Sequence, residues 1–481
     1  MDSEKDSRVS VQINDVVSDL GDYTHVDQTV RRLKVWTIGT ALFVQIGYVL
    51  PHGGPGSFLL AFVFWSTVMM AINNCLAEMV SWIPISSPFI CFADQFVDPA
   101  RGFCAGINFF LYPAILVPFE ITAFELVIHF WTEKIPTAVV IEVVLACYVA
   151  LNVFVVRFYG EYQKTRSTGR LLGFLSCLFQ AVFTMCGPEF VSNTAGEAEN
   201  PRTTLPRTFK GVYTRVTIFF ILGALSVGIL LPYSDSNLQL ALSDPKPGAG
   251  SSPYVIAMQN MSIPVLPHVV NALIMLSIFS AGNSYVFCAS RALYDMALQS
   301  RLPGFLTRCT RNGVPIYCVG VTMLIALLAF LQVLNGTAKV LEWFVSLTAA
   351  TQVINYAIVS FTYLRFYYAQ GIPRSSLPFC GPLQPFCDYY ALALTLIMPF
   401  ISGYSVFMAG NWDTTIFFFS YTIIGVLPIL FVIWKVLHRT LLIPPKEVTF
   451  FEDERIMIDD YETSFVSEKS KTAGLERWII G

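Results

Sequence analysis

The residues best suited to chemistry stand where a long apolar run is broken. Cys186, Gly187, Pro188 and Glu189 follow one another near the end of a run that begins at about residue 171. Proline cannot donate a helix hydrogen bond, glycine weakens the helix, and a carboxylate is costly in hydrocarbon. Such a break inside a bundle exposes backbone groups that bind small molecules. A simple proline kink, with a glutamate near the membrane surface, is the alternative.

Ile38, Gly39 and Thr40 form a second interruption, in the first apolar run. Inverted-repeat transporters bind substrates at two broken helices, where helix N-termini attract a carboxylate and freed carbonyls accept a cation. Taken alone, these three residues are also explained by close helix packing. Together, the two breaks predict a site for a zwitterion such as an amino acid.

Other polar residues lie within apolar runs. A carboxylate at mid-bilayer costs roughly 2.5–3.5 kcal/mol on insertion scales, so Glu120 is expected either to bind a proton or substrate or to be a paired structural acid. Ser280 and Asn283 place small polar side chains in a later run. No phosphate-binding loop or hydrolase signature occurs, the five histidines lie far apart, and the eleven cysteines include no CxxC pair. The sequence therefore predicts no enzyme, metal site or cofactor.

The composition indicates an integral membrane protein. Of 481 residues, 54% are hydrophobic and 13% charged, whereas soluble domains carry about 25% charged residues. A net charge of −3 without a basic patch argues against nucleic-acid binding. Because a membrane helix needs about 20 apolar residues, we predict an all-α polytopic fold. The expected spans are residues 37–50, 57–82, 103–131, 137–156, 171–192, 216–232, 265–288, 315–334, 340–363, 389–409 and 414–435.

The basic loops predict a cytoplasmic N-terminus, with tails 1–34 and 439–481 flanking a transmembrane domain at 35–438. Their alternation fails once. Segments 157–170 and 193–215 are both basic and flank a single span, so either that span is re-entrant or another is missing.

Motifs spread along the chain resemble those of fungal amino-acid permeases, the yeast amino-acid transporter family of the amino acid–polyamine–organocation superfamily. The most specific is the Gly-Glu-Ala-Glu-Asn-Pro-Arg stretch at residues 196–202, directly after the broken helix. Further matching segments are residues 38–40, 52–55, 96–100, 159–161, 265–268, 280–284, 290–294 and 313–315.

The resemblance implies a LeuT-like fold of five-plus-five inverted repeats with two further helices. It also implies proton-coupled amino-acid uptake by alternating access at the plasma membrane, driven by the proton gradient without a cofactor. The family's first broken helix maps onto Ile38, Gly39 and Thr40, expected at the substrate carboxylate. The sixth helix, which maps onto Cys186, Gly187, Pro188 and Glu189, is expected at the amino group. The third-helix acid maps onto Glu120. Expected partners are the amino acid, the proton, the bilayer, and trafficking or ubiquitination machinery on the tails.

Two departures from the family affect this expectation. Lys34, Val35 and Trp36 lead directly to Thr37, where family members carry several more residues, so the first helix is shortened. After Tyr159-Gly160-Glu161, members continue through a fifth helix and an external loop that this chain lacks. The alternative is therefore a non-transporting or incomplete permease: a truncated gene model, a splice form or an amino-acid sensor.

Overall fold

The computed structural model describes a helical bundle within one compact unit, Trp36–Gly481. The predicted first span, with Ile38, Gly39 and Thr40, lies outside the described residues except for Leu50, and so do both predicted tails except for residues 439–444. The described residues are 50–85, 87–128, 130–131, 134–154, 170–185, 187–193, 195, 201–232, 234–235, 252–310, 313–335, 337–369, 374, 377–407 and 412–444.

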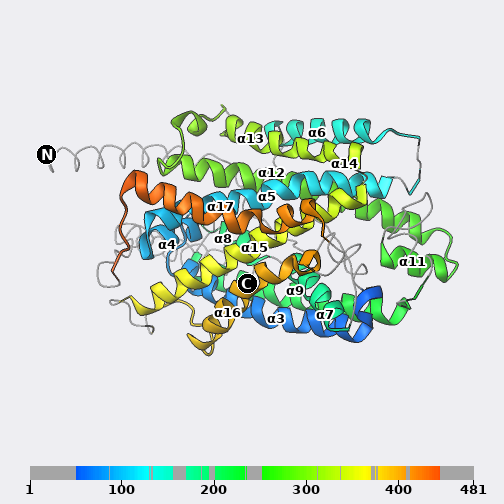
Figure 1. Cartoon of the computed structure of the whole chain (residues 1–481), viewed down its shortest axis with the longest axis horizontal. Coiled ribbons are helices and arrows are strands. Elements are labelled where there is room, and N and C mark those ends of the chain that lie inside the picture. The colour runs from blue at the N-terminus through cyan, green and yellow to red at the C-terminus, as the bar shows by residue number, and fades with distance from the viewer. Residues whose placement is uncertain are drawn as a thin grey trace, which may run out of the picture. The chain divides into compact units, whose positions relative to one another are not determined.

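The elements in these ranges are helices, which confirms the predicted all-α class (Figure 1). Seven are long and apolar enough to cross a membrane, and two apolar helices are shorter. The long ones are α3 (Leu50–Trp82), α5 (Pro99–Ile128), α9 (Pro201–Leu230), α12 (Leu266–Leu298), the continuous α13–η6–α14 (Ile316–Asn335), α15 (Thr337–Tyr368) and α17 (Thr414–His438). The shorter ones are α6 (Thr137–Phe154) and α16 (Phe386–Ser402).

Most helix bounds lie within a few residues of the predicted spans, with two informative differences. The run 171–192 is not one helix but two, α7 (Arg170–Thr184) and α8 (Pro188–Asn193). Helix α9 begins at Pro201, well before the predicted start at residue 216. Proline suits the first helical turn, where its missing N–H is not needed, so the basic stretch before the apolar run continues the same helix.

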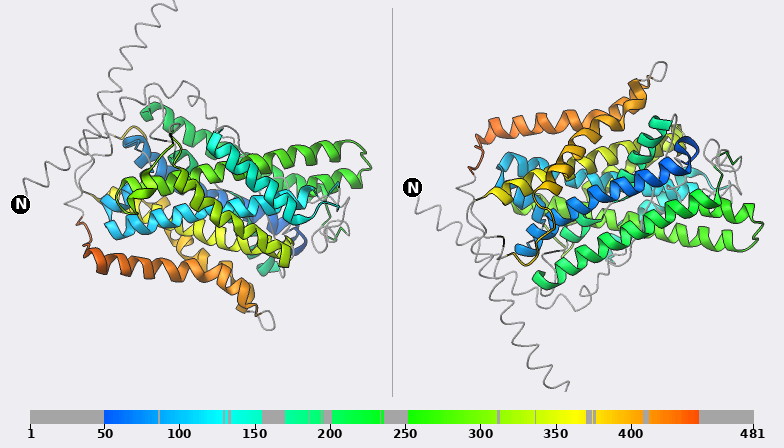
Figure 2. Two further views of the ribbon diagram at one scale, coloured as in Figure 1. Left: turned by 90° about the horizontal axis from the view of Figure 1, so that it is seen from above. Right: turned by 90° about the horizontal axis from the view of Figure 1, so that it is seen from below.

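Helix α5 lies at the centre of the bundle and α17 at its periphery. Within the most apolar 18-residue stretch of each helix, 83% is buried in α5, against 17% in α17. Figure 2 shows α17, in orange, along an outer side of the bundle in both views. A helix that is apolar all round suits either full burial or contact with lipid, and these two helices represent the two cases.

Ion pairs gather at one end of the bundle, next to the short helix α4 (Pro88–Phe96), and we call this the α4 end. Arg301 pairs with Asp94 at 2.7 Å and Lys435 with Asp98 at 2.5 Å. The opposite end carries α11 (Pro253–Asn260) and the start of α3 (Figure 1). The α4 end is therefore held by contacts between segments far apart in the sequence.

Helices α6 and α7–α8 run in the same direction, toward the α4 end. Helix α6 starts beside the end of α5, where Thr137 donates to Glu125 at 2.8 Å, and continues to Asn152, which donates to Asn283 midway along α12. In Figure 1, α7 lies toward the end of the bundle where α3 begins, and α8 lies toward α4, where Asn193 accepts a hydrogen bond from Ser87. Residues 155–169, which connect α6 to α7, lie outside the described residues.

Candidate functional site

The predicted break in the fifth apolar run is present between α7 and α8. Helix α7 ends at Thr184, whose hydroxyl donates to the Gln180 carbonyl at 2.8 Å. Gly187 has a φ of 152°, in the region that favours glycine. Pro188 then opens α8 as its first residue. Cys186 lies outside the described residues. The Gly-Pro pair thus ends one helix and starts another inside the bundle.

The carboxylate of Glu189 is buried at this break and accepts hydrogen bonds from neutral groups. The Tyr356 hydroxyl lies 3.1 Å from Oε1 and 3.0 Å from Oε2. The Gly187 N–H donates to Oε2 at 3.2 Å, and the Tyr112 hydroxyl lies 3.5 Å from Oε1. Buried carboxylates need hydrogen bonds or a counter-charge. These contacts supply hydrogen bonds from neutral groups only. A proton can therefore still neutralise the Glu189 carboxylate, or a substrate ammonium group can still act as its counter-charge.

Two further helices support this arrangement. On α15, Gln352 Nε2 donates to the Tyr356 hydroxyl at 2.9 Å, which orients the hydroxyl toward Glu189. The ring of Phe190, next to Glu189, has its centroid 6.2 Å from that of Tyr112 on α5 and 6.0 Å from that of Tyr285 on α12. Helices α5, α8, α12 and α15 therefore meet around one carboxylate.

Glu120 is fully buried on α5 but belongs to a different part of the interior. Tyr112, the α5 residue that reaches Glu189, precedes Glu120 by two helical turns, about 12 Å of rise. The charge of Glu120 acts instead on Tyr148 of α6. The structure thus places the proton candidate between α5 and α6, apart from the hydroxyls around Glu189.

The small polar stretch of α12, predicted to line the same site, packs against α6. Asn283 is buried and accepts a hydrogen bond from the side chain of Asn152. A Cβ on the adjacent Gly282 would lie 2.0 Å from the Tyr148 hydroxyl oxygen, so only glycine fits there. Ser280 is half-buried one turn earlier. Helix α12 reaches the break with Tyr285 instead.

Tyr112, Gln352 and Tyr356 belong to the hydrogen-bond network of Glu189 but are absent from the sequence predictions. Those predictions rest on charged and small residues, and these three are neither. A usable signal was the spacing of Gln352 and Tyr356, four residues apart on one face of an apolar helix. Polar side chains repeated on one face of a membrane helix point toward protein rather than lipid.

The amino acid permease family model matches residues 36–165 and 163–442. A general amino acid permease of Saccharomyces cerevisiae is 36% identical, over 80% of this chain and 74% of the relative. A basic amino-acid permease of the same yeast is 34% identical, over 77% and 73%. A proline-specific permease of Emericella nidulans is 32% identical, over 84% and 82%. Among solved structures, a mutant manganese transporter of Eremococcus coleocola aligns over 82% of this chain and 93% of that one, at 12% identity and a TM-score of 0.45.

The two matched stretches meet at residues 163–165, within the connection between α6 and α7. The alignment with the first yeast relative runs over 441 residues. Since 80% of 481 residues is about 385, about 56 of these positions have no counterpart in this chain. A membrane-spanning helix needs about 20 residues, so the difference leaves room for one helix and a loop.

Proposed function

Because the chain belongs to the amino acid permease family, we propose that it carries amino acids across a membrane, with Glu189 receiving the ammonium group of the substrate. The observation that carries this proposal is the buried Glu189 carboxyl, which sits at a helix break and is contacted by neutral donors. An ammonium group would supply a counter-charge that no ion pair among the described residues gives to Glu189. The substrate carboxylate would be bound by Ile38, Gly39 and Thr40 of the first span.

Proton coupling would provide the energy. One charge moving down 100 mV releases about 2.3 kcal/mol, enough for appreciable accumulation of substrate. Glu189 and Glu120 are the candidate carriers, since both carboxyl groups are buried. Alternating access in a five-plus-five repeat would expose the Glu189 site to each side in turn.

We place the protein in the plasma membrane with the α4 end in the cytoplasm. Arg301, Arg365 and Lys435 all lie at this end, and cytoplasmic ends of membrane proteins are rich in basic residues. The N-terminus would then also be cytoplasmic.

A second candidate function, binding without transport, is favoured by the direction of the helices. Helices α6 and α7 both run toward the α4 end (Figure 1), whereas consecutive spans of a membrane protein cross the membrane in opposite directions, so the loss of a crossing between them would explain their course. The connecting residues 155–169 carry Arg157, Lys164 and Arg166, and charged side chains are costly in hydrocarbon. A sensor or an incomplete permease would tolerate this loss better than a transporter that must alternate between two states.

Uptake of a labelled mixture of the proteinogenic amino acids by cells expressing the chain tests both candidates. Transport predicts uptake above that of empty cells, reduced at least about tenfold by Glu189→Gln. Glu142→Gln is the matched control, because it removes an exposed carboxylate from the apolar helix α6, and it should leave uptake unchanged. Surface protein is measured in every case. Absent uptake at normal surface levels would favour the non-transporting form, and full uptake by Glu189→Gln would remove Glu189 from the site.

A further inference from the structure

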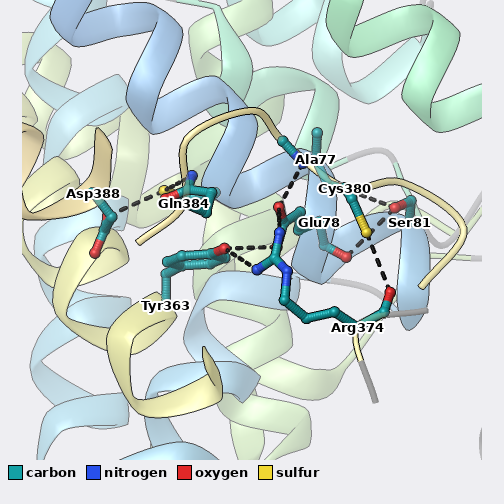
Figure 3. Close-up of polar contacts among 10 residues, drawn as sticks. Ala77, Glu78, Ser81, Tyr363, Arg374, Cys380, Gln384 and Asp388 are labelled. Atoms are coloured by element: carbon teal, nitrogen blue, oxygen red, sulfur yellow. Dashed lines mark hydrogen bonds and ion pairs between the residues drawn. The ribbon is translucent and has the colours of Figure 1, made fainter. Parts of the chain in front are cut away.

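A second buried carboxylate, Glu78, lies near the end of α3 (Figure 3). Its Oε1 accepts from Arg374 Nη2 at 2.8 Å and from the Gly381 N–H at 2.5 Å. Its Oε2 accepts from the Tyr363 hydroxyl at 2.6 Å, and Arg374 Nη1 also donates to that hydroxyl at 3.3 Å. One carboxylate of α3 is thus tied both to α15 and to the connection between α15 and α16.

The described part of this connection lies directly on α3. A Cβ on Gly381 would stand 3.0 Å from Asn74 Cβ and 3.2 Å from Glu78 Oε1. The backbone at Gly381 therefore lies so close to α3 that a larger residue would be crowded there. Gln384 Nε2 donates to the sulfur of Cys75 at 3.3 Å, and Cys75 donates to Asp388 Oδ1 at 3.1 Å. The connection therefore covers a buried thiol of α3.

The two members of the ion pair differ in their access to water. The Glu78 side chain is fully buried, whereas that of Arg374 is 35% exposed and lies over the ring of Tyr367 at 5.0 Å. Separating the pair would leave a buried carboxylate without a cation, which favours the closed arrangement. The guanidinium is already in contact with water and can leave from that side. Opening of this contact is therefore expected from the exposed side of Arg374, at the α4 end.

Helix α15 links this contact to the break in the fifth apolar run. Tyr356 and Tyr363 are seven residues apart and so share one face of the helix. Tyr356 donates to Glu189 on α8, and Tyr363 donates to Glu78 on α3. A movement of α15 that lengthens one of these hydrogen bonds therefore acts on the other.

We propose that Glu78, Tyr363 and Arg374 form a latch that closes the α4 end of the bundle and is coupled through α15 to the contact between Tyr356 and Glu189. In transport, and here the inference rests on the proposed function, the latch opens when the substrate leaves toward the α4 end. The latch itself requires only the contacts described above, so it can be tested without transport.

The thiol of Cys75 reports on the latch, because Gln384 of the connection covers it. In membranes containing the full chain, the rate of N-ethylmaleimide labelling at Cys75 is measured by peptide mass spectrometry. Arg374→Gln should raise this rate at least about tenfold, because losing the partner of a buried charge favours local opening. Arg374→Lys should raise it less. Cys318, equally buried on α13, is the internal reference and should keep its rate.

An unchanged rate at Cys75 in Arg374→Gln would overturn the latch. So would an equal rise at Cys75 and Cys318, which would mean that the ion pair stabilises the whole fold. The coupling is tested by Tyr356→Phe, which should raise labelling of Cys75 about twofold to threefold through α15. Tyr368→Phe removes an exposed hydroxyl of α15 that lies 3.1 Å from the Tyr389 hydroxyl on α16 rather than near Glu189, so any rise should be smaller than in Tyr356→Phe. Equal rates in these two variants would overturn the coupling, whether or not the chain transports amino acids.

Discussion

Glu78 and Glu189 are two buried carboxylates contacted by tyrosine hydroxyls from the same face of α15, yet their surroundings differ in one respect. Glu78 has a cation, Arg374, at 2.8 Å. The hydrogen-bond donors of Glu189 are two phenols and a backbone N–H. A carboxylate that is already paired stabilises one arrangement of helices, whereas a carboxyl held by neutral donors can still take up a proton or an ammonium group. Charge pairing thus distinguishes a structural contact from a binding group.

The largest effect is expected at the ion pair. Arg374→Gln leaves Glu78 buried without a counter-charge and should lower the free energy of unfolding by about 2–3 kcal/mol. This is less than the 3–5 kcal/mol of a fully buried pair, because Arg374 is partly exposed. The double variant with Glu78→Gln should recover most of this loss, since no unpaired charge remains. Unfolding in mixed micelles measures both.

The matched comparison is Glu189→Gln, which should cost less than about 1 kcal/mol because its neutral donors can also contact an amide. A loss as large as that of Arg374→Gln would contradict the distinction between the two carboxylates. It would indicate that Glu189 also has a structural charge partner.

The next effect concerns the donors of Glu189. Tyr356→Phe removes a hydroxyl that contacts both carboxylate oxygens, and hydrogen bonds to charged groups contribute about 1.5–3 kcal/mol. Uptake at limiting amino-acid concentration should fall about tenfold or more. Tyr112→Phe should have a smaller effect, because its contact is 3.5 Å long. The exposed Tyr368→Phe is the control. Equal uptake by the variants at positions 356 and 368 would contradict the positioning of Glu189 by α15.

The sequence predicts the helix break at Glu189 better than it predicts the partners of either carboxylate. Gly187, Pro188 and Glu189 are adjacent in the sequence, and their chemistry alone requires a break in an apolar helix. Their partner Tyr356 is separated from Glu189 by 167 positions. Its role depends on which face of α15 turns inward, and a helix buried on most sides gives no periodic signal for that face. Arg374 follows α15 and its partner Glu78 stands near the end of α3, 296 positions away, so no local pattern in the sequence joins them.

The conflict in helix direction could be predicted, because the basic residues of each loop and the length of each apolar run can be read directly from the sequence. Arg157, Lys164 and Arg166 stand before the fifth apolar run, and Arg202 and Arg207 after it, so two basic loops flank what would be a single crossing. The parallel course of α6 and α7 is the structural counterpart of that inconsistency. The bounds of α9 were harder to predict, because a helix can continue beyond the apolar segment into polar surroundings.

The smallest effect is expected at Asp94, a half-buried acid whose surroundings are intermediate between those of Glu78 and those of Glu189. Arg301 pairs with it at 2.7 Å, yet burial outweighs this pairing and raises the pKa of Asp94 above its ordinary value of 3.8. An acid whose pKa is raised in the folded state holds a proton that the unfolded chain has lost, so stability falls as pH rises from 3.8 through the folded pKa. Asp94→Asn should remove this slope, and because it also takes the carboxylate away from the nearly buried Arg301, it should change stability at pH 7 by less than about 1 kcal/mol in total. Thermal unfolding in detergent between pH 4 and 7 measures it, with the exposed Glu142→Gln as control. If stability instead rose with pH relative to Asp94→Asn, the attraction of Arg301 would outweigh burial, and Asp94 would resemble Glu78 rather than stand between it and Glu189.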